Sequence, residues 1–287
     1  MNSIRLVEKI GAAFNRRIYN LHPKAFIYDG HCRRTPNLPL TAVIDKDIEA
    51  RVWPGDIIGK ELYVRGLIEE AETRAIGKML VPGMVFFDIG ANLGFYSLLS
   101  AKKVGPTGQV HSFEPNPRIF QELLFNIKLN KFNNIYPNQI ALSDHNGRGL
   151  LSSHERGEEV YGSLSDRNFP GVSIIGHDDV QLESLDSYIE KHGVNRIDFI
   201  KIDVEGAELD VLRGANNTLD ILRPKNIMFE LSEINVAGFG YRCIDVLSLL
   251  RVKGYGIYLP YRNGKLEKLN GNPEKYSGSP SFVARLP

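Results

Sequence analysis

The stretch that decides the fold is Val85-Phe-Phe-Asp-Ile-Gly-Ala-Asn-Leu-Gly-Phe-Tyr-Ser97. Its first five residues are apolar except for Asp88, and glycines follow at positions 90 and 94 before a helical pattern begins. This order predicts a buried strand that turns sharply into a helix, because glycine permits tight turns and lets a ligand approach without a Cβ in its way. In open α/β sheets, a loop at the carboxyl end of a strand is where ligands bind.

The alternation of strand and helix continues along the chain. Short apolar strands are expected at 84–89, 110–113, 135–142, 197–202, 226–230, 256–260 and 281–285. Helices are expected between them, and a polar, glycine-containing stretch at 144–183 interrupts the rhythm. Short apolar strands that alternate with helices are typical of a parallel sheet covered on both faces. We therefore predict an α/β fold with a Rossmann-like doubly wound sheet, mostly parallel with an antiparallel closing strand, and an inserted flap at 144–183.

The N-terminal residues follow a different pattern. Apolar residues recur at steps of three and four between residues 3 and 21, which predicts an amphipathic helix. Residues 24–40 are expected to form turns, followed by strands at 41–44 and 48–53. We predict an N-terminal helical and β extension over 1–65, and a domain over 66–287 that contains the flap.

Composition excludes several classes of protein. The 287 residues are 43% apolar and 24% charged, as in ordinary globular proteins. The net charge of +1 divides unevenly, because residues 1–34 hold seven basic and two acidic side chains and the remainder holds 28 and 32. A dedicated nucleic-acid binder needs a larger basic excess, so we expect no nucleic-acid partner. The basic N-terminal helix is expected to pack on the domain or on a second subunit in a homodimer; docking to an acidic partner or membrane surface is the alternative.

Cysteine usage and hydropathy indicate the compartment. Cys32 and Cys243 are far apart and form no motif, which favours a reducing compartment, and we expect a cytoplasmic protein. No run approaches the ~20 apolar residues of a transmembrane segment, and charged residues interrupt the N-terminus where a secretory signal would need an apolar core.

The glycine loop narrows the choice of ligand. Counted from Gly90, the next two glycine positions of a dinucleotide fingerprint hold Asn92 and Phe95, so the fingerprint fails twice and argues against a nicotinamide oxidoreductase. Asp88 would repel a pyrophosphate and would suit a cationic ligand. Glu114 ends the next strand, 20 residues after Gly94, where an acid can accept both ribose hydroxyls. The alternative is that Asp88 and Glu114 only cap helices.

These motifs resemble class I S-adenosylmethionine-dependent methyltransferases, specifically the FkbM-type family. The matching text is FFDIGANLGFYS at 86–97, SFEPNP at 112–117, ALSD at 141–144, LDSYI at 185–189 and IDFIKIDVEGAELDVLRGA at 197–215. The resemblance covers about 66–235 and excludes the first 60 residues. It implies that S-adenosylmethionine is the cofactor. The implied contacts are Asp88, Gly90, Asn92 and Gly94 in the loop, Glu114 on the ribose, Ala141 and Leu142 beside the adenine, and Glu69 upstream.

The strand at 197–202 carries the expected chemistry. Lys201 and Asp203 share one face, and a lysine in an apolar strand is costly unless it is paired. The resemblance places the end of this strand beside the transferred methyl group, so Asp203 is the candidate base and Glu230, at the end of the next strand, is the second. A divalent cation held by Asp203 and Glu230 is a weaker alternative, and the metal is left unknown. A purely structural Lys201–Asp203 pair is the other alternative.

The resemblance thus predicts methyl transfer to a hydroxyl group on a sugar, glycan or polyketide-like natural product, with a small-molecule or glycan acceptor as partner. The alternatives are N-methylation of a small-molecule amine and a catalytically inactive cofactor-binding module. The flap is the expected lid, with residues 161–165 as its contact with cofactor or acceptor.

Overall fold

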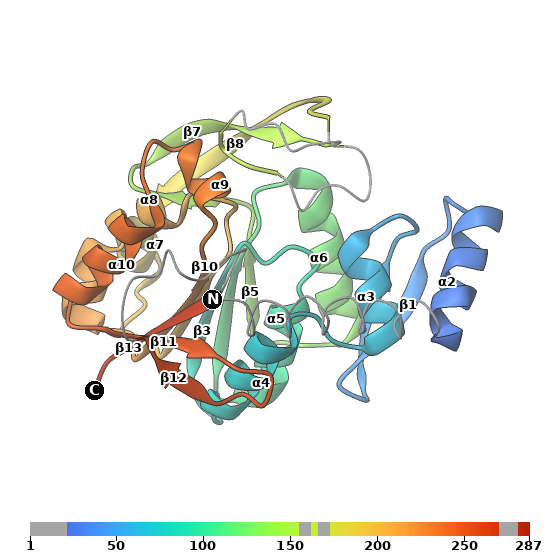
Figure 1. The fold of residues 1–287 in the computed structure, drawn as a ribbon, viewed down its shortest axis with the longest axis horizontal. Coiled ribbons are helices and arrows are strands. Elements are labelled where there is room, and N and C mark those ends of the chain that lie inside the picture. The colour runs from blue at the N-terminus through green and yellow to red at the C-terminus, as the bar shows by residue number, and fades with distance from the viewer. Residues whose placement is uncertain (1–21, 155–161, 166–172, 270–280) are drawn as a thin grey trace, which may run out of the picture. The chain divides into compact units, whose positions relative to one another are not determined.

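A computed structural model describes residues 22–154, 162–165, 173–269 and 281–287. The chain divides into two compact units, Met1–Ile68 and Glu69–Pro287. The amphipathic helix expected at residues 3–21 lies outside the described residues. Figure 1 shows the elements and their labels.

The described residues of the first unit form two helices and a hairpin: α2 (Pro23–Arg34), β1 (Leu40–Ile44), β2 (Ile48–Val52) and α3 (Ile57–Arg65). The expectation of turns at 24–40 is wrong for most of that stretch. Pro23 occupies the first turn of α2, where its missing N–H costs nothing, and His22 Nδ1 accepts a hydrogen bond from the Lys24 amide at 3.2 Å. Helix α3 was not predicted. The hairpin pairs antiparallel and buries Ala42, Ile44 and Val52.

The second unit is built on an eight-stranded sheet in the order β12-β11-β13-β10-β9-β3-β4-β5. Its strands are β3 (Val85–Ile89), β4 (Gln109–Phe113), β5 (Ile135–Asn138), β9 (Phe199–Ile202), β10 (Asn226–Glu230), β11 (Gly256–Pro260), β12 (Leu266–Lys268) and β13 (Ser281–Arg285). The five strands from β10 to β5 are parallel, and β13 runs antiparallel between β10 and β11. The predicted fold class is therefore confirmed, including the antiparallel closing strand.

Helices cover both faces of this sheet (Figure 1). One face carries α4 (Glu70–Met79), α5 (Phe95–Val104) and α6 (Pro117–Leu129), and the other carries α7 (Leu185–His192), α8 (Glu208–Arg213) and α10 (Cys243–Val252). The expected long helix after β9 is broken into α8 and a π-helical turn, η2 (Thr218–Leu222). The break comes at Gly214. A Cβ on this residue would lie 2.0 Å from the Ser143 carbonyl oxygen, so only glycine fits there. Helix α9 (Glu233–Ala237) and strand β12 were not predicted.

The flap contains a three-stranded sheet of its own. The strand expected at 135–142 is two strands, because only β5 joins the main sheet and β6 (Ala141–Ser143) pairs parallel with β8 (Gly176–Ser184). Strand β8 also pairs antiparallel with β7 (Gly147–Ser153), which forms the hairpin of the flap. A bilayer-spanning helix needs about 20 apolar residues, and no helix within the described residues meets that requirement.

Candidate active site

The glycine loop between β3 and α5 touches the end of β9. Gly90 and Gly94 have φ values of 83° and 93°, in the left-handed region that favours glycine. A Cβ on Gly90 would lie 1.9 Å from the Asp203 carbonyl oxygen, so only glycine fits there. Asn92 also has a positive φ of 50°, which asparagine tolerates better than most residues. The loop is therefore held in a strained shape against the strand that carries Asp203.

Glu114 fixes the loop from the end of β4. Its carboxylate accepts hydrogen bonds from the backbone amides of Asn92 and Asn116, both at 2.9 Å. The side chain is 7% exposed, and burial raises its pKa to about 7. Each carboxylate oxygen has two lone pairs, so Glu114 can still accept hydrogen bonds from a ligand.

Asp88 is almost fully buried, at 1% exposure. Its Oδ2 accepts a hydrogen bond from Ser97 Oγ at 2.5 Å, and Ser97 in turn meets Ser112 at 2.7 Å. Its Oδ1 has no hydrogen-bond partner among the described residues. Burial raises the pKa of Asp88, and Lys201 lies opposite it on the neighbouring strand. Ser97 and Ser112 were not predicted to belong to this network. The sequence feature that could have identified Ser97 is a polar residue on the buried face of α5.

Three carboxylates meet at the strand ends. Oxygens of Glu69, Asp203 and Glu230 lie within 4.8 Å of one another, although Glu69 precedes α4, Asp203 follows β9 and Glu230 ends β10. Lys201 Nζ pairs with Asp203 Oδ2 at 2.9 Å. The two expected catalytic acids are thus neighbours, and Glu69, expected among the cofactor contacts, lies with them. This set of Glu69, Lys201, Asp203 and Glu230 is called the strand-end cluster below.

The charge of the cluster is centred on Asp203. Burial, followed by the charge of Asp203, raises the pKa of Glu69 to about 7 and that of Glu230 to about 9. Burial disfavours the charged form of Lys201, but the charges of Asp203, Glu69 and Asp88 raise its pKa above the usual value. The cluster therefore holds a Lys201–Asp203 ion pair beside two carboxyl groups that bind protons more tightly than usual.

Geometry would let the three carboxylates share a divalent cation, since oxygen ligands suit magnesium. The Lys201 ammonium already neutralises Asp203 within the cluster. We therefore assign no metal ligand.

The flap reaches the turn after Asp203. Ser163 Oγ donates a hydrogen bond to the Glu205 carbonyl oxygen at 3.1 Å. Ser163 is also bonded to Ser152 of β7: the Ser152 amide donates to the Ser163 carbonyl oxygen, and the Ser163 amide donates to Ser152 Oγ. Of the expected contact at 161–165, residue 161 lies outside the described residues. Glu205 has a φ of 52°, a strained conformation that its hydrogen bond to Asn235 Nδ2 at 2.7 Å helps to hold.

The expected adenine contacts lie in the flap sheet, not in the main sheet. Ala141 and Leu142 belong to β6 and are 7% and 2% exposed. Leu142 packs in the largest apolar cluster, with Phe113 and Leu185, whereas Ala141 packs against Leu182 of β8. Neither is part of the strand-end cluster.

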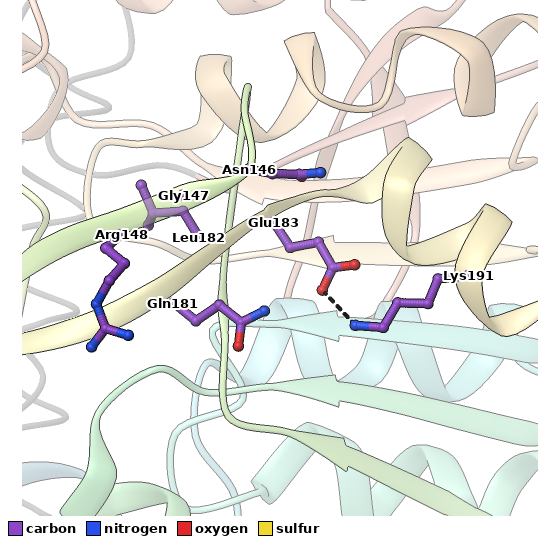
Figure 2. A pocket seen from close by; sticks show the side chains of 7 residues that line it. All are labelled: Asn146, Gly147, Arg148, Gln181, Leu182, Glu183 and Lys191. Carbon is purple, nitrogen blue, oxygen red and sulfur yellow. Dashed lines mark ion pairs between the residues drawn. The ribbon is translucent and has the colours of Figure 1, made fainter.

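A separate hollow of about 420 Å³ opens between the flap and α7 (Figure 2). It is lined by Asn146, Gly147, Arg148, Gln181, Leu182, Glu183 and Lys191. Glu183 and Lys191 face each other across it at 3.5 Å. It contains none of the predicted site residues, Glu183 pairs with Lys191, and Arg148 pairs with Asp179 outside the lining, so we place the active site at the strand ends.

The sheet order and the glycine loop flanked by strand-end acids define the class: this is a class I S-adenosylmethionine-dependent methyltransferase fold. The sequence model of the methyltransferase FkbM domain matches residues 88–257, more than half of the chain. The chain belongs to the FkbM methyltransferase family. The resemblance read from the motifs is confirmed, and with it the enzyme class and its cofactor.

Three relatives are 28–30% identical to this chain over the aligned stretches. Hexuronic acid methyltransferase AglP of Haloferax volcanii is 29% identical over 195 residues, which cover 68% of this chain and 69% of AglP. The 31-O-demethyl-FK506 methyltransferase FkbM of Streptomyces tacrolimicus is 28% identical over 78% of this chain and 88% of its own length. The 2-O-methyltransferase NoeI of Sinorhizobium fredii is 30% identical over 48% and 60%.

A solved structure of an FkbM methyltransferase from Methylobacillus flagellatus KT aligns with 79% of this chain and 54% of its own. The identity is 14% and the TM-score 0.44, too loose a likeness to add to the assignment.

Proposed function

We propose that the protein transfers a methyl group from S-adenosylmethionine to a hydroxyl group of a sugar, glycan or polyketide-like acceptor. The observation that carries the proposal is the strand-end cluster, in which Asp203 pairs its carboxylate with Lys201 and lies with its backbone carbonyl against Gly90 of the glycine loop. The names of AglP, NoeI and FkbM describe methylation of a hexuronic acid and two O-methylations, which supports a hydroxylated acceptor.

The strand-end residues fit this cofactor. Asp203 and the ionised fraction of Glu69 would bring negative charge to the sulfonium and ammonium groups, and all three carboxyl groups of the cluster can accept hydrogen bonds. Glu114 is placed to accept hydrogen bonds from the ribose hydroxyls, while Gly90, Asn92 and Gly94 let the methionine part approach the backbone.

The remaining residues expected at the cofactor would meet different parts of it. Glu69 would face the amino-acid end, and Ala141 and Leu142 would border the adenine. Asp88 would support the site indirectly, through its hydrogen bond from Ser97 and its position opposite Lys201 on the neighbouring strand.

Bound S-adenosylmethionine would supply a methyl group activated by its sulfonium. The chain must then align the acceptor and take its hydroxyl proton. Asp203 is the proposed base, and Lys201 orients its carboxylate at 2.9 Å. Glu230, with a pKa of about 9, is protonated at neutral pH and would donate a hydrogen bond to the acceptor instead of acting as the base. Glu230, the second candidate for the base, is therefore proposed as a hydrogen-bond donor.

Calorimetric titration with S-adenosylhomocysteine tests the cofactor part of the proposal. Wild-type protein should bind it, and Glu114→Ala should bind about tenfold more weakly or worse. Absence of binding by the wild type would refute the proposal. Methyl transfer should then be screened against hydroxylated and amino acceptors, with and without a chelator; transfer to amines alone would favour N-methylation. The homodimer through residues 1–65 and the cytoplasmic location stay predictions.

A further inference from the structure

Tyr96 touches two members of the strand-end cluster at once. It is the second residue of α5, directly after the glycine loop, and is 4% exposed. Its hydroxyl donates a hydrogen bond to Glu69 Oε2 at 2.7 Å and accepts one from Thr73 Oγ1 at 3.5 Å. Lys201 Nζ lies 4.6 Å from the centre of its ring. One side chain thus links the residue before α4 to the lysine of β9.

Both partners of Tyr96 need support that their own segments do not provide. Glu69 is the N-cap of α4 with φ 44°, an uncommon backbone conformation, and its side chain makes no capping hydrogen bond. Lys201 is 5% exposed, and a buried ammonium is costly unless other groups compensate for lost water. The negative face of an aromatic ring compensates in part, together with the charges of Asp203, Glu69 and Asp88.

We propose that Tyr96 is a positioning residue of the cofactor site, which fixes the Glu69 carboxylate through its hydroxyl and the Lys201 ammonium through its ring. The proposal rests on the proposed function, because it takes the strand-end cluster to face bound S-adenosylmethionine. A tyrosine that only filled the core would need no such partners. Tyr255 is the example in this chain: it is 3% exposed, and its hydroxyl donates to the Pro224 carbonyl oxygen at 2.8 Å.

The matched pair of variants is Tyr96→Phe and Tyr255→Phe, since each removes one buried phenol hydrogen bond and keeps the ring. We expect both to lower the melting temperature by similar amounts. Only Tyr96→Phe should weaken binding of S-adenosylmethionine, by about tenfold in calorimetric titration, because it releases a carboxylate that meets the cofactor. Tyr255→Phe should bind within about twofold of wild type.

A double-mutant cycle shows whether Tyr96 acts through Glu69. Glu69→Gln should weaken binding, and Tyr96→Phe added to Glu69→Gln should weaken it no further, because the carboxylate that Tyr96 positions is gone. Additive losses would overturn the proposal.

The pH dependence separates positioning from packing. The groups that face Glu69 are Tyr96 of α5, Lys201 and Asp203 of the β9 end, Glu230 of β10 and Glu72 of α4. The Tyr96 hydroxyl lowers the pKa of Glu69, so its removal raises that pKa and leaves less Glu69 ionised at a given pH. The Tyr96→Phe loss should therefore be larger at pH 6.5 than at pH 8.5, and this difference should vanish in the Glu69→Gln background.

The outcomes are distinct. A loss of equal size at both pH values, or no loss, would overturn the role of Tyr96. A wild-type protein that binds neither S-adenosylmethionine nor S-adenosylhomocysteine would instead overturn the proposed function on which it rests.

Discussion

The ammonium of Lys201 and the carboxylate of Asp203 lie 2.9 Å apart at the end of β9, with side chains 6% and 28% exposed. They are two residues apart and therefore on the same face of the strand. The same face of β3 presents Asp88 to Lys201. After burial, the charge of Asp203 is the largest influence on the pKa of Glu69 and of Glu230.

Replacing Lys201 with methionine should destabilise the protein by about 2 kcal/mol. Removing one partner of a fully buried pair costs about 3–5 kcal/mol, and the partial exposure of Asp203 reduces that cost. Urea unfolding measures the loss. Because the cost comes from an uncompensated charge, the double variant Lys201→Met, Asp203→Asn should recover part of the stability; a further loss in the double variant would contradict this explanation.

Glu114 should make cofactor binding depend on pH. Its pKa of about 7 in the free protein means that it is half protonated at neutral pH, whereas ribose hydroxyls donate hydrogen bonds to the ionised form. Affinity for S-adenosylmethionine should therefore level off above pH 7 and fall by up to about tenfold per unit below it.

Calorimetry in two buffers of different ionisation heat should show proton release on binding at pH 6.5. Glu114→Gln cannot ionise, so it should release fewer protons and show a shallower pH dependence. An unchanged proton release in Glu114→Gln would assign the effect to other groups, such as Glu69.

Gly90→Ala and Gly193→Ala form a matched pair. Both glycines have positive φ, 83° and 63°, but an added Cβ meets nothing within 4 Å at Gly193 and would lie 1.9 Å from the Asp203 carbonyl oxygen at Gly90. Gly193→Ala should cost about 1 kcal/mol from backbone strain alone. Gly90→Ala should cost more and should also weaken S-adenosylhomocysteine binding, because the loop must move away from β9. Equal effects would show that the contact with Asp203 is not important.

Most strands of the main sheet were predictable because they are short apolar runs. Strands β10 and β13 fall where the sequence places them, at 226–230 and 281–285. Helix α2 was missed because Pro23 marks either the end of one helix or the start of the next, and local sequence does not distinguish the two. The break after α8 depends on Ser143, which approaches Gly214 only in the folded chain.

The sequence indicated that Lys201, Asp203 and Glu230 lie together, but it did not place Glu69 with them. Asp203 and Glu230 were recognised at strand ends, whereas Glu69 enters their cluster from 134 positions before Asp203. Tyr96 follows a glycine loop in a helix with an apolar pattern, so its sequence context indicates a core residue. Its role appears only when α4, α5 and β9 are brought together.

Glu230 provides the last test, because its charge state can be measured without knowing the acceptor. Its pKa is about 9 in the folded protein and near 4.5 when unfolded, so folding favours the protonated form. As pH rises from 4.5 toward 9, the unfolded state ionises first and the contribution of Glu230 to stability falls. Glu230→Gln keeps the shape of the protonated side chain and cannot ionise. Its free energy of unfolding should therefore exceed that of wild type by a margin that grows between pH 5 and pH 8.5, measured by urea unfolding.

Asp203→Asn is the control for the Glu230 experiment. The charge of Asp203 is the second cause of the raised pKa of Glu230, after burial. Removing the charge of Asp203 should lower the pKa of Glu230. The gain in free energy of unfolding from Glu230→Gln should therefore be smaller in the Asp203→Asn background than in wild type. Parallel stability curves for wild type and Glu230→Gln would mean that Glu230 is already ionised at neutral pH. In that case Glu230 would return as a candidate for the base, beside Asp203.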